Sequence, residues 1–210
     1  MNGAEAKEIV RLGYDRVSQA YRSDDFRLEG SGYVNWLSWL TPELAPGSRI
    51  LDLGCGCGIP VTRALSAAHD VLGLDVSEVQ IERARRLVPR ARFLRDDMTK
   101  VEFAPGSFHA VVALYAIIHV PIEEQLALLR RVASWLVPDG WLLATVGADA
   151  WTGTEDNWRE VPGATMYWSH ADAATYRDWL AEAGLQVMRE EDQIDPHGGK
   201  HMIVLAQRGS

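Results

Sequence analysis

Three glycines alternate with single residues just after a short apolar run, in the segment Ile50-Leu51-Asp52-Leu53-Gly54-Cys55-Gly56-Cys57-Gly58. The apolar run predicts a buried strand, and the stretch after the glycines predicts a helix. Glycines let the backbone take positive φ and let a ligand approach without meeting a Cβ, while a helix N-terminus offers unpaired N–H groups. The loop is therefore expected to hold a ligand that carries an anionic group.

Two further acids follow the next apolar runs along the chain. Asp75 ends the run 69–75, and Asp97 follows the run 91–95. Ligands of open α/β sheets gather at the carboxyl ends of the strands, so we expect these acids to share one site with the glycine loop. A carboxylate accepts two hydrogen bonds from vicinal hydroxyls, which makes Asp75 the predicted contact of a ribose.

The glycine spacing separates two classes of nucleotide-binding loop. A dinucleotide loop has the pattern Gly-x-Gly-x-x-Gly, which needs a glycine where this chain has Ile59. An NAD-dependent oxidoreductase is therefore disfavoured. The observed Asp-x-Gly-x-Gly-x-Gly pattern resembles the first motif of class I, Rossmann-like S-adenosylmethionine-dependent methyltransferases of the small-molecule type.

This resemblance implies where the cofactor of that family, S-adenosyl-L-methionine, would be held. The glycine loop would bind its methionine half, Asp75 its ribose and Asp97 its adenine, with Asp96 left open as the adenine contact by a slip of one residue. The cofactor-binding residues predicted on this basis are Tyr14, Asp52, Gly54, Cys55, Gly56, Asp75, Val76, Asp97, Met98, Ala113 and Leu114.

Histidines and aromatic side chains are the candidates for the methyl acceptor's side of the site. His119 lies in the loop after the fourth predicted strand and is the first candidate for a general base, with His170 second. An acceptor that is already a carboxylate, a phenolate or a free amine would need no base. Packing in the core is the competing interpretation for the aromatic residues. The predicted substrate-binding residues are Tyr21, Tyr33, Tyr115, Trp151, Tyr167 and Trp168.

Apolar runs and amphipathic stretches predict the elements that position these residues. Strands are expected at 49–53, 69–75, 91–95, 109–115, 141–146, 185–189 and 201–206. Helices are expected at 4–21, 32–40, 61–68, 78–87, 123–136 and from 169 or 172 to 183. Strand and helix alternate up to residue 146, which predicts a parallel sheet with right-handed crossovers. The last two strands, joined by a loop at 195–199, are expected to pair antiparallel.

The predicted fold class is α/β, a three-layer sandwich with a seven-stranded, mostly parallel sheet whose last strand is antiparallel. The 210 residues are expected to form a single methyltransferase domain. Glycines, a proline and many aromatic residues break the rhythm of strands and helices at 147–170, which predicts an irregular aromatic lid. The expected parts are an N-terminal helical cap (1–46), a cofactor-binding core (49–147), the lid insertion (148–170) and a C-terminal helix and strand pair (171–208).

Composition narrows the partners and the location. The net charge of −8 argues against nucleic acid and favours a small molecule. No stretch approaches the ~20 apolar residues of a membrane span, and the first residues have no signal-peptide features, so a cytoplasmic location is expected. Cys55 and Cys57 are too close for an ordinary disulfide and form only a weak metal signal, so no metal is predicted. Whether the chain forms a homodimer is left open.

The sequence therefore predicts an S-adenosylmethionine-dependent methyltransferase that transfers a methyl group to a small molecule. The acceptor atom is expected to be O or N, with C and S left open. The alternative is a non-methylating enzyme, such as a cyclase, that uses the same cofactor on the same scaffold. A non-catalytic binding module is a third interpretation, against which the aromatic residues of the predicted lid argue.

Overall fold

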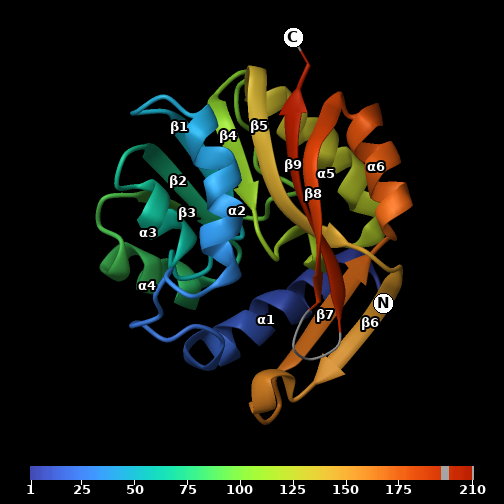
Figure 1. The fold of residues 1–210 in the computed structure, drawn as a ribbon. Coiled ribbons are helices and arrows are strands. Elements are labelled where there is room, and N and C mark those ends of the chain that lie inside the picture. The colour runs from blue at the N-terminus through green and yellow to red at the C-terminus, as the bar shows by residue number, and fades with distance from the viewer. Residues whose placement is uncertain (195–198, 210) are drawn as a thin grey trace.

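A central sheet of seven strands organises the computed structural model, which describes residues 1–194 and 199–209. Its strands lie in the order β3-β2-β1-β4-β5-β9-β8 (Figure 1). They are β1 (Arg49–Leu53), β2 (Asp70–Asp75), β3 (Arg92–Arg95), β4 (Phe108–Ala113), β5 (Leu136–Gly147), β8 (Leu185–Ile194) and β9 (Lys200–Arg208). A separate two-stranded sheet is formed by β6 (Trp151–Asp156) and β7 (Thr165–His170).

The strand directions confirm the predicted sheet. Strands β1 to β5 pair in parallel, and β9 pairs antiparallel with both β5 and β8. The last strand is thus the one that runs against its neighbours, because no helix separates β8 from β9 and the two can pair directly. The predicted connecting loop at 195–199 lies, except for Gly199, outside the described residues.

Helices cover both faces of the sheet, as the predicted three-layer architecture requires. Helices α2 and α3 pack with Ile50 and Val112 on one face, and α5 and α6 pack with Leu51 and Val111 on the other. Neighbouring residues of one buried parallel strand therefore face opposite layers. The helices are α1 (Gly3–Tyr21), α2 (Gly32–Leu40), α3 (Val61–Leu65), α4 (Glu78–Leu87), α5 (Ile122–Trp135) and α6 (Ala173–Glu182), with short 3-10 segments at Thr41–Glu43, Ile117–His119 and Trp158–Glu160.

Helix α1 crosses the lower end of the sheet instead of covering a face of it, as the dark blue ribbon in Figure 1 shows. A capping box between Asn2 and Glu5 closes its N-terminus. Its middle lies against β7 at Gly13, where a Cβ would be only 2.6 Å from the carbonyl oxygen of Thr165. The close approach allows α1 and β7 to pack against each other across the end of the sheet.

The prediction of an irregular lid at 147–170 is wrong in its local structure, because this segment forms the β6–β7 hairpin. Met166 and Tyr167 of β7 are buried in one cluster with Val10 and Val17 of α1. Contacts with a helix about 150 residues earlier in the chain therefore stabilise the strand, and such contacts override the local signal of glycines and prolines.

Several element boundaries also differ from the prediction: β4 ends at Ala113 instead of 115, and β8 extends to Ile194 instead of 189. Strand β5 begins at Leu136 instead of 141, because Leu136 pairs with Phe108 ahead of a register shift in the ladder. Helix α3 ends at Leu65 instead of 68. The carboxyl ends of β1, β2 and β3 lie where they were predicted. Among the described residues, no helix is both long enough and apolar enough to span a membrane.

Candidate functional site

A cavity opens at the carboxyl ends of β1, β2 and β4, against helix α1. We call it the edge cavity. Its empty volume is about 710 Å³, including space that is open to solvent. The elements that the sequence predicted to carry the site do meet here. The predicted residues that line the edge cavity are Tyr14, Tyr21, Gly54, Gly56, Asp75, Val76, Asp97, Met98, Leu114, Tyr115 and His119.

Two glycines of the loop after β1 shape one wall of the edge cavity. Gly54 and Gly56 have φ of +70° and +54°, in the left-handed region that favours glycine. A Cβ on Gly54 would lie 2.5 Å from the Cβ of Ala116, so this glycine allows the loop to pack on the segment after β4. At Gly56 a Cβ would meet no atom within 4 Å, which leaves this part of the backbone open to a ligand.

Asp75 lies buried at the end of β2, facing the glycine loop. Its Oδ2 accepts a hydrogen bond from the backbone N–H of Gly56 at 2.9 Å, and its Oδ1 accepts one from Ser77 at 2.9 Å. Burial raises the pKa of Asp75 to about 6, although the backbone hydrogen bonds act to lower it. A carboxylate has about four lone-pair sites, so both oxygens can still accept donors from the cavity.

Asp97 lies after β3 and joins that loop to helix α1. Its Oδ1 accepts hydrogen bonds from the N–H and the hydroxyl of Thr99, each at 2.9 Å, and its Oδ2 accepts one from the ammonium of Lys7 at 3.1 Å. Burial acts to raise the pKa of Asp97, but the hydrogen bonds lower it overall, so the carboxylate is ionised at neutral pH. Asp96 also lines the edge cavity, so it remains the alternative candidate for the adenine contact.

A second cavity lies on the other side of the glycine loop, with an empty volume of about 440 Å³. Gly54 and Gly56 line both cavities, and Cys55 and Tyr33 line this one. Asp52 also lines it and accepts a hydrogen bond from the hydroxyl of Thr62 at 2.5 Å. Burial raises the pKa of Asp52 to about 7. A group that is only partly ionised at neutral pH suits a structural tie between β1 and α3.

Arg22 brings a positive charge to this second cavity. Its Nη2 donates a hydrogen bond to the hydroxyl of Tyr33 at 2.8 Å, and its guanidinium lies 4.9 Å from the ring centroid of Tyr21. Among the described residues, no aspartate or glutamate forms an ion pair with Arg22. The guanidinium therefore remains available to an anionic group of a ligand.

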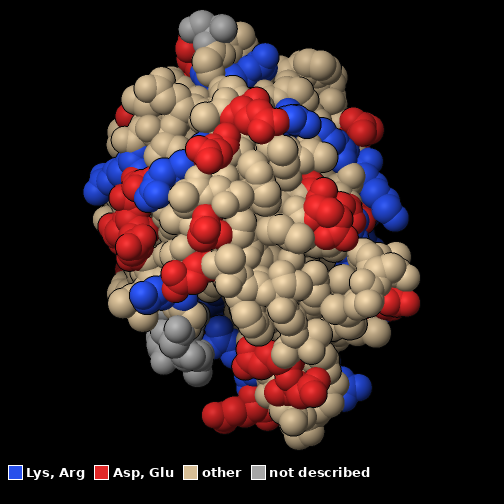
Figure 2. Space-filling model, turned by 90° about the vertical axis from the view of Figure 1, so that its right-hand side faces the viewer, with Lys and Arg blue, Asp and Glu red and all other residues tan. Residues whose placement is uncertain are grey.

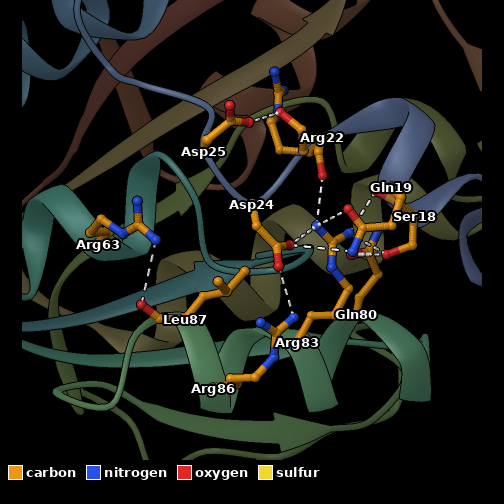
Figure 3. A network of polar contacts seen from close by, with 11 residues as sticks. Ser18, Gln19, Arg22, Asp24, Asp25, Arg63, Gln80, Arg83, Arg86 and Leu87 are labelled. Carbon is orange, nitrogen blue, oxygen red and sulfur yellow. Dashed lines mark hydrogen bonds and ion pairs between the residues drawn. The ribbon is translucent and has the colours of Figure 1, made fainter.

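A buried arginine of α4 fixes the chain next to Arg22, as Figure 3 shows. Arg83 donates hydrogen bonds to the carbonyl oxygens of Ser18 at 2.6 Å and Arg22 at 2.7 Å, and it forms an ion pair with Asp24 at 2.6 Å. The end of α1 is thereby held on α4, and the backbone of Arg22 is set beside the glycine loop.

The predicted base His119 is buried, with an exposed fraction of 5%, and both of its ring nitrogens have partners. Nδ1 lies 2.7 Å from the carbonyl oxygen of Tyr167, which can only accept, so Nδ1 carries the proton. Burial lowers the pKa of His119 to about 4, so the ring is neutral at pH 7. Its Nε2 therefore accepts the hydroxyl proton of Tyr14 at 3.0 Å.

Eight predicted residues do not line the edge cavity: Asp52, Cys55 and Tyr33 line the second cavity, and the other five lie elsewhere. Ala113 is fully buried in the core of the sheet, and the ring of Tyr167 is buried against α1, so neither lines the edge cavity and their ligand contacts stay predictions. Side chains alternate between the two faces of a strand. Tyr167 therefore faces α1, and its neighbour Trp168 points to the opposite face of β7. Trp151, Trp168 and His170 line a third cavity at the hairpin, although the Trp168 ring centroid is 4.4 Å from that of His119.

Comparison with known families decides between the classes of nucleotide-binding fold. Residues 50–140, from β1 to the start of β5, match the family model described as "Methyltransferase domain". This segment belongs to the methyltransferase domain family. The match confirms the resemblance predicted from the glycine loop and overrides the dinucleotide alternative.

Relatives of this methyltransferase domain act on different molecules. The chain is 32% identical over 167 residues to a 27-O-demethylrifamycin SV methyltransferase of Amycolatopsis mediterranei, a match that covers 71% of this chain and 58% of the relative. It is 30% identical over 158 residues to phosphoethanolamine N-methyltransferase 3 of Arabidopsis thaliana, covering 73% of this chain and 32% of the relative. The chain spans about a third of the length of the first relatives that it matches, which include fungal sterol 24-C-methyltransferases.

A solved structure confirms the methyltransferase fold over the whole chain. The structure of 1,6-didemethyltoxoflavin-N1-methyltransferase from Burkholderia thailandensis superposes with a TM-score of 0.73 at 18% identity, covering 100% of this chain and 92% of that one. At this identity the likeness shows the fold alone. The superposition extends over the hairpin and helix α1 as well as the matched segment.

The domain's site contains residues that the sequence alone did not indicate. Lys7 and Arg22 lie on or next to α1, far in sequence from the strand ends that they approach. A basic residue in a polar helix gives no signal of its contacts, so only the docking of α1 reveals them. No group of three or more histidine, cysteine or acidic side chains suited to hold a metal ion is found among the residues that the structure describes.

Proposed function

We propose that this protein is an S-adenosylmethionine-dependent methyltransferase that acts on a small molecule. The observation that carries the proposal is that Gly56, Asp75 and Asp97 line one cavity at the carboxyl edge of a methyltransferase-type sheet. The relatives named above act on small molecules of unlike chemistry, which supports the substrate class without indicating the acceptor.

The donor and acceptor groups of the site fit the proposed cofactor. Asp75 has two free lone-pair sites for the hydroxyls of a ribose, and Asp97 has one left for the amino group of adenine. Met98 offers an apolar contact for the adenine ring. Gly54 and Gly56 open the backbone between the two cavities, and Arg22 would bind the carboxylate of the methionine half.

When bound, the cofactor supplies a methyl group already activated on a sulfonium, so the chain's task is mainly to position and enclose. The lone pair of His119 is engaged by Tyr14, which leaves the predicted base without a free site while that hydrogen bond is made. We infer that Tyr14 and His119 serve as a rigid wall of the edge cavity. An acceptor that brings its own lone pair, without needing a base, fits this arrangement best.

The proposal is tested by titrating the protein with S-adenosylhomocysteine and, separately, with NAD in a calorimeter. We expect S-adenosylhomocysteine to bind with a Kd of about 1 to 100 μM, within the range in which enzymes bind metabolites, and NAD to show no binding. Binding of NAD alone, or of neither compound, would contradict the proposal. Incubation of a candidate acceptor with methyl-labelled cofactor then tests whether the label is transferred.

Replacing Arg22 with methionine is expected to weaken the binding of S-adenosylhomocysteine by about 10- to 100-fold, because a charge-assisted hydrogen bond contributes about 1.5 to 3 kcal/mol. The informative measurement compares this ligand with its decarboxylated analogue. Wild type should prefer the carboxylate form, and the variant should bind both forms equally.

Arg27, an exposed arginine five residues later, provides the matched control. An Arg27→Met variant should keep the wild-type preference. If Arg22→Met weakened both ligands to the same extent, Arg22 would have a structural role and not a carboxylate contact.

A further inference from the structure

The third cavity lies at the β6–β7 hairpin, one layer of rings away from the edge cavity. We call it the hairpin cavity; its empty volume is about 1000 Å³, including space open to solvent. Trp168 and His201 line the hairpin cavity, whereas His119 and Tyr115 line the edge cavity. The ring centroids of Trp168 and His119 are 4.4 Å apart, and those of His201 and Tyr115 are 5.7 Å apart. A molecule in the hairpin cavity would therefore lie directly behind the wall of the proposed reaction site.

Three indole rings form the apolar part of the hairpin cavity. They belong to Trp151, Trp158 and Trp168. Trp151 is 47% exposed, so part of its ring is open to a ligand in the cavity. Tryptophan is also the ring that attracts cations most strongly. The guanidinium of Arg159 lies 5.3 Å from the ring centroid of Trp158, but no lysine or arginine of the described chain lies over Trp151 or Trp168.

The charged side chains of the hairpin cavity favour a positive ligand. Glu155 and Glu160 line it, both are exposed, and neither forms an ion pair within residues 1–194 and 199–209. Figure 2 shows acidic side chains gathered on the end of the molecule at the bottom of the view, where the hairpin projects in Figure 1. Burial lowers the pKa of His170, so this histidine adds no charge at neutral pH. Arg159 is the cationic group of the lining, and its guanidinium is directed at rings.

We propose that the hairpin cavity binds a small organic cation with a flat apolar body, of the protonated aromatic amine class, at a site separate from the edge cavity. The indole faces of Trp151 and Trp168 would contact the body and the cation, and the carboxylates of Glu155 and Glu160 would complement its charge. The binding of a cation in the hairpin cavity does not rest on the proposed function.

The test uses three probes that share one aromatic body and differ in charge: 2-phenylethylamine, 2-phenylethanol and phenylacetate. Their dissociation constants are measured by ligand-observed NMR titration of the whole chain at pH 7, without any cofactor. We expect the amine to bind about fivefold more tightly than the alcohol, and phenylacetate to bind most weakly, because the exposed carboxylates of Glu155 and Glu160 attract an ammonium by about 1 kcal/mol and repel a carboxylate.

The double variant Glu155→Gln with Glu160→Gln localises the binding. Both residues are exposed, so the variant should fold, and the amine and the alcohol should then bind within about twofold of each other. Asp192→Asn, an exposed acid of β8 outside the cavity, should keep the wild-type preference. Equal binding of amine and alcohol to wild type, strongest binding of phenylacetate, or an amine preference that survives in the double variant would each overturn the proposal. Because no cofactor is present, failure here is separate from failure to bind S-adenosylhomocysteine.

Discussion

Replacing Asp75 with alanine is expected to weaken the binding of S-adenosylhomocysteine by about 100-fold or more. Two hydrogen bonds from ribose hydroxyls to a carboxylate would be lost, each contributing about 1.5 to 3 kcal/mol. The Gly56 N–H would also lose its acceptor, so the loop between the two cavities would become less fixed. Calorimetric titration measures the change, and an affinity within threefold of wild type would contradict the ribose assignment.

The pH dependence of binding provides a second measurement for the same residue. The pKa of Asp75 is raised to about 6 in the folded protein, so the carboxylate is ionised above that pH and is progressively protonated below it. We therefore expect affinity for S-adenosylhomocysteine to fall as the pH is lowered from 7 to 5. The Asp75→Ala variant should show a weaker dependence. A dependence equal to that of wild type would assign the titration to another group, such as Asp52, whose pKa is raised to about 7.

Unfolding of the Asp75→Ala variant would not explain its weaker binding of S-adenosylhomocysteine. A folded pKa above the unfolded value means that the unfolded carboxyl releases its proton first, so stability falls as the pH rises from about 4 to about 6. Above pH 6 the buried, ionised carboxylate of Asp75 thus lowers the stability of the folded protein. Its removal therefore offsets part of the stability that is lost with the hydrogen bonds to Gly56 and Ser77. Asp70→Asn, an exposed acid at the start of the same strand, is the matched control.

The sequence alone was sufficient to predict the positions of the site residues that lie at or just after the end of a strand. The positions of Gly54, Gly56, Asp75 and Asp97 depend on only two features, the alternation of strands and helices and the parallel sheet that it predicts. In such a sheet, each strand brings its last residues to the same edge. The edge cavity lies there, so local patterns were enough to place these residues together.

The remaining site residues depend on contacts that the local sequence does not encode. Arg22 reaches the glycine loop because Arg83 of α4 holds the end of α1, and these two residues are 61 positions apart. Trp168 and Tyr167 were assigned one role because 147–170 was predicted as irregular, whereas a strand places them on opposite faces. The chemistry of His119 likewise depends on Tyr14, 105 positions away, and on a tautomer set by a distant carbonyl.

Gln125 shows how far such contacts extend beyond the cavities. The sequence places it in an amphipathic helix as one polar residue among others, yet it is completely buried. Its Nε2 donates hydrogen bonds to the carbonyl oxygens of Val120 at 2.7 Å and Ser169 at 2.6 Å, with Ile117 more distant at 3.2 Å. Its Oε1 accepts the hydroxyl proton of Tyr176. One side chain thus joins α5 to the loop that carries His119, to β7 and to α6.

Replacing Gln125 with leucine is expected to lower the free energy of unfolding by about 3 to 5 kcal/mol. Leucine fits the volume but leaves buried carbonyl oxygens and the Tyr176 hydroxyl without partners, at about 1 to 3 kcal/mol for each unsatisfied group. Chemical denaturation measures this change. Tyr176→Phe removes only one of these hydrogen bonds and should cost about 1 to 2 kcal/mol, while Gln186→Leu on the exposed side of β8 should cost little. If Gln125→Leu cost no more than Tyr176→Phe, the carbonyls would have other partners. The loop and the hairpin strand would then be held by apolar packing, and the wall between the edge and hairpin cavities would not depend on this amide.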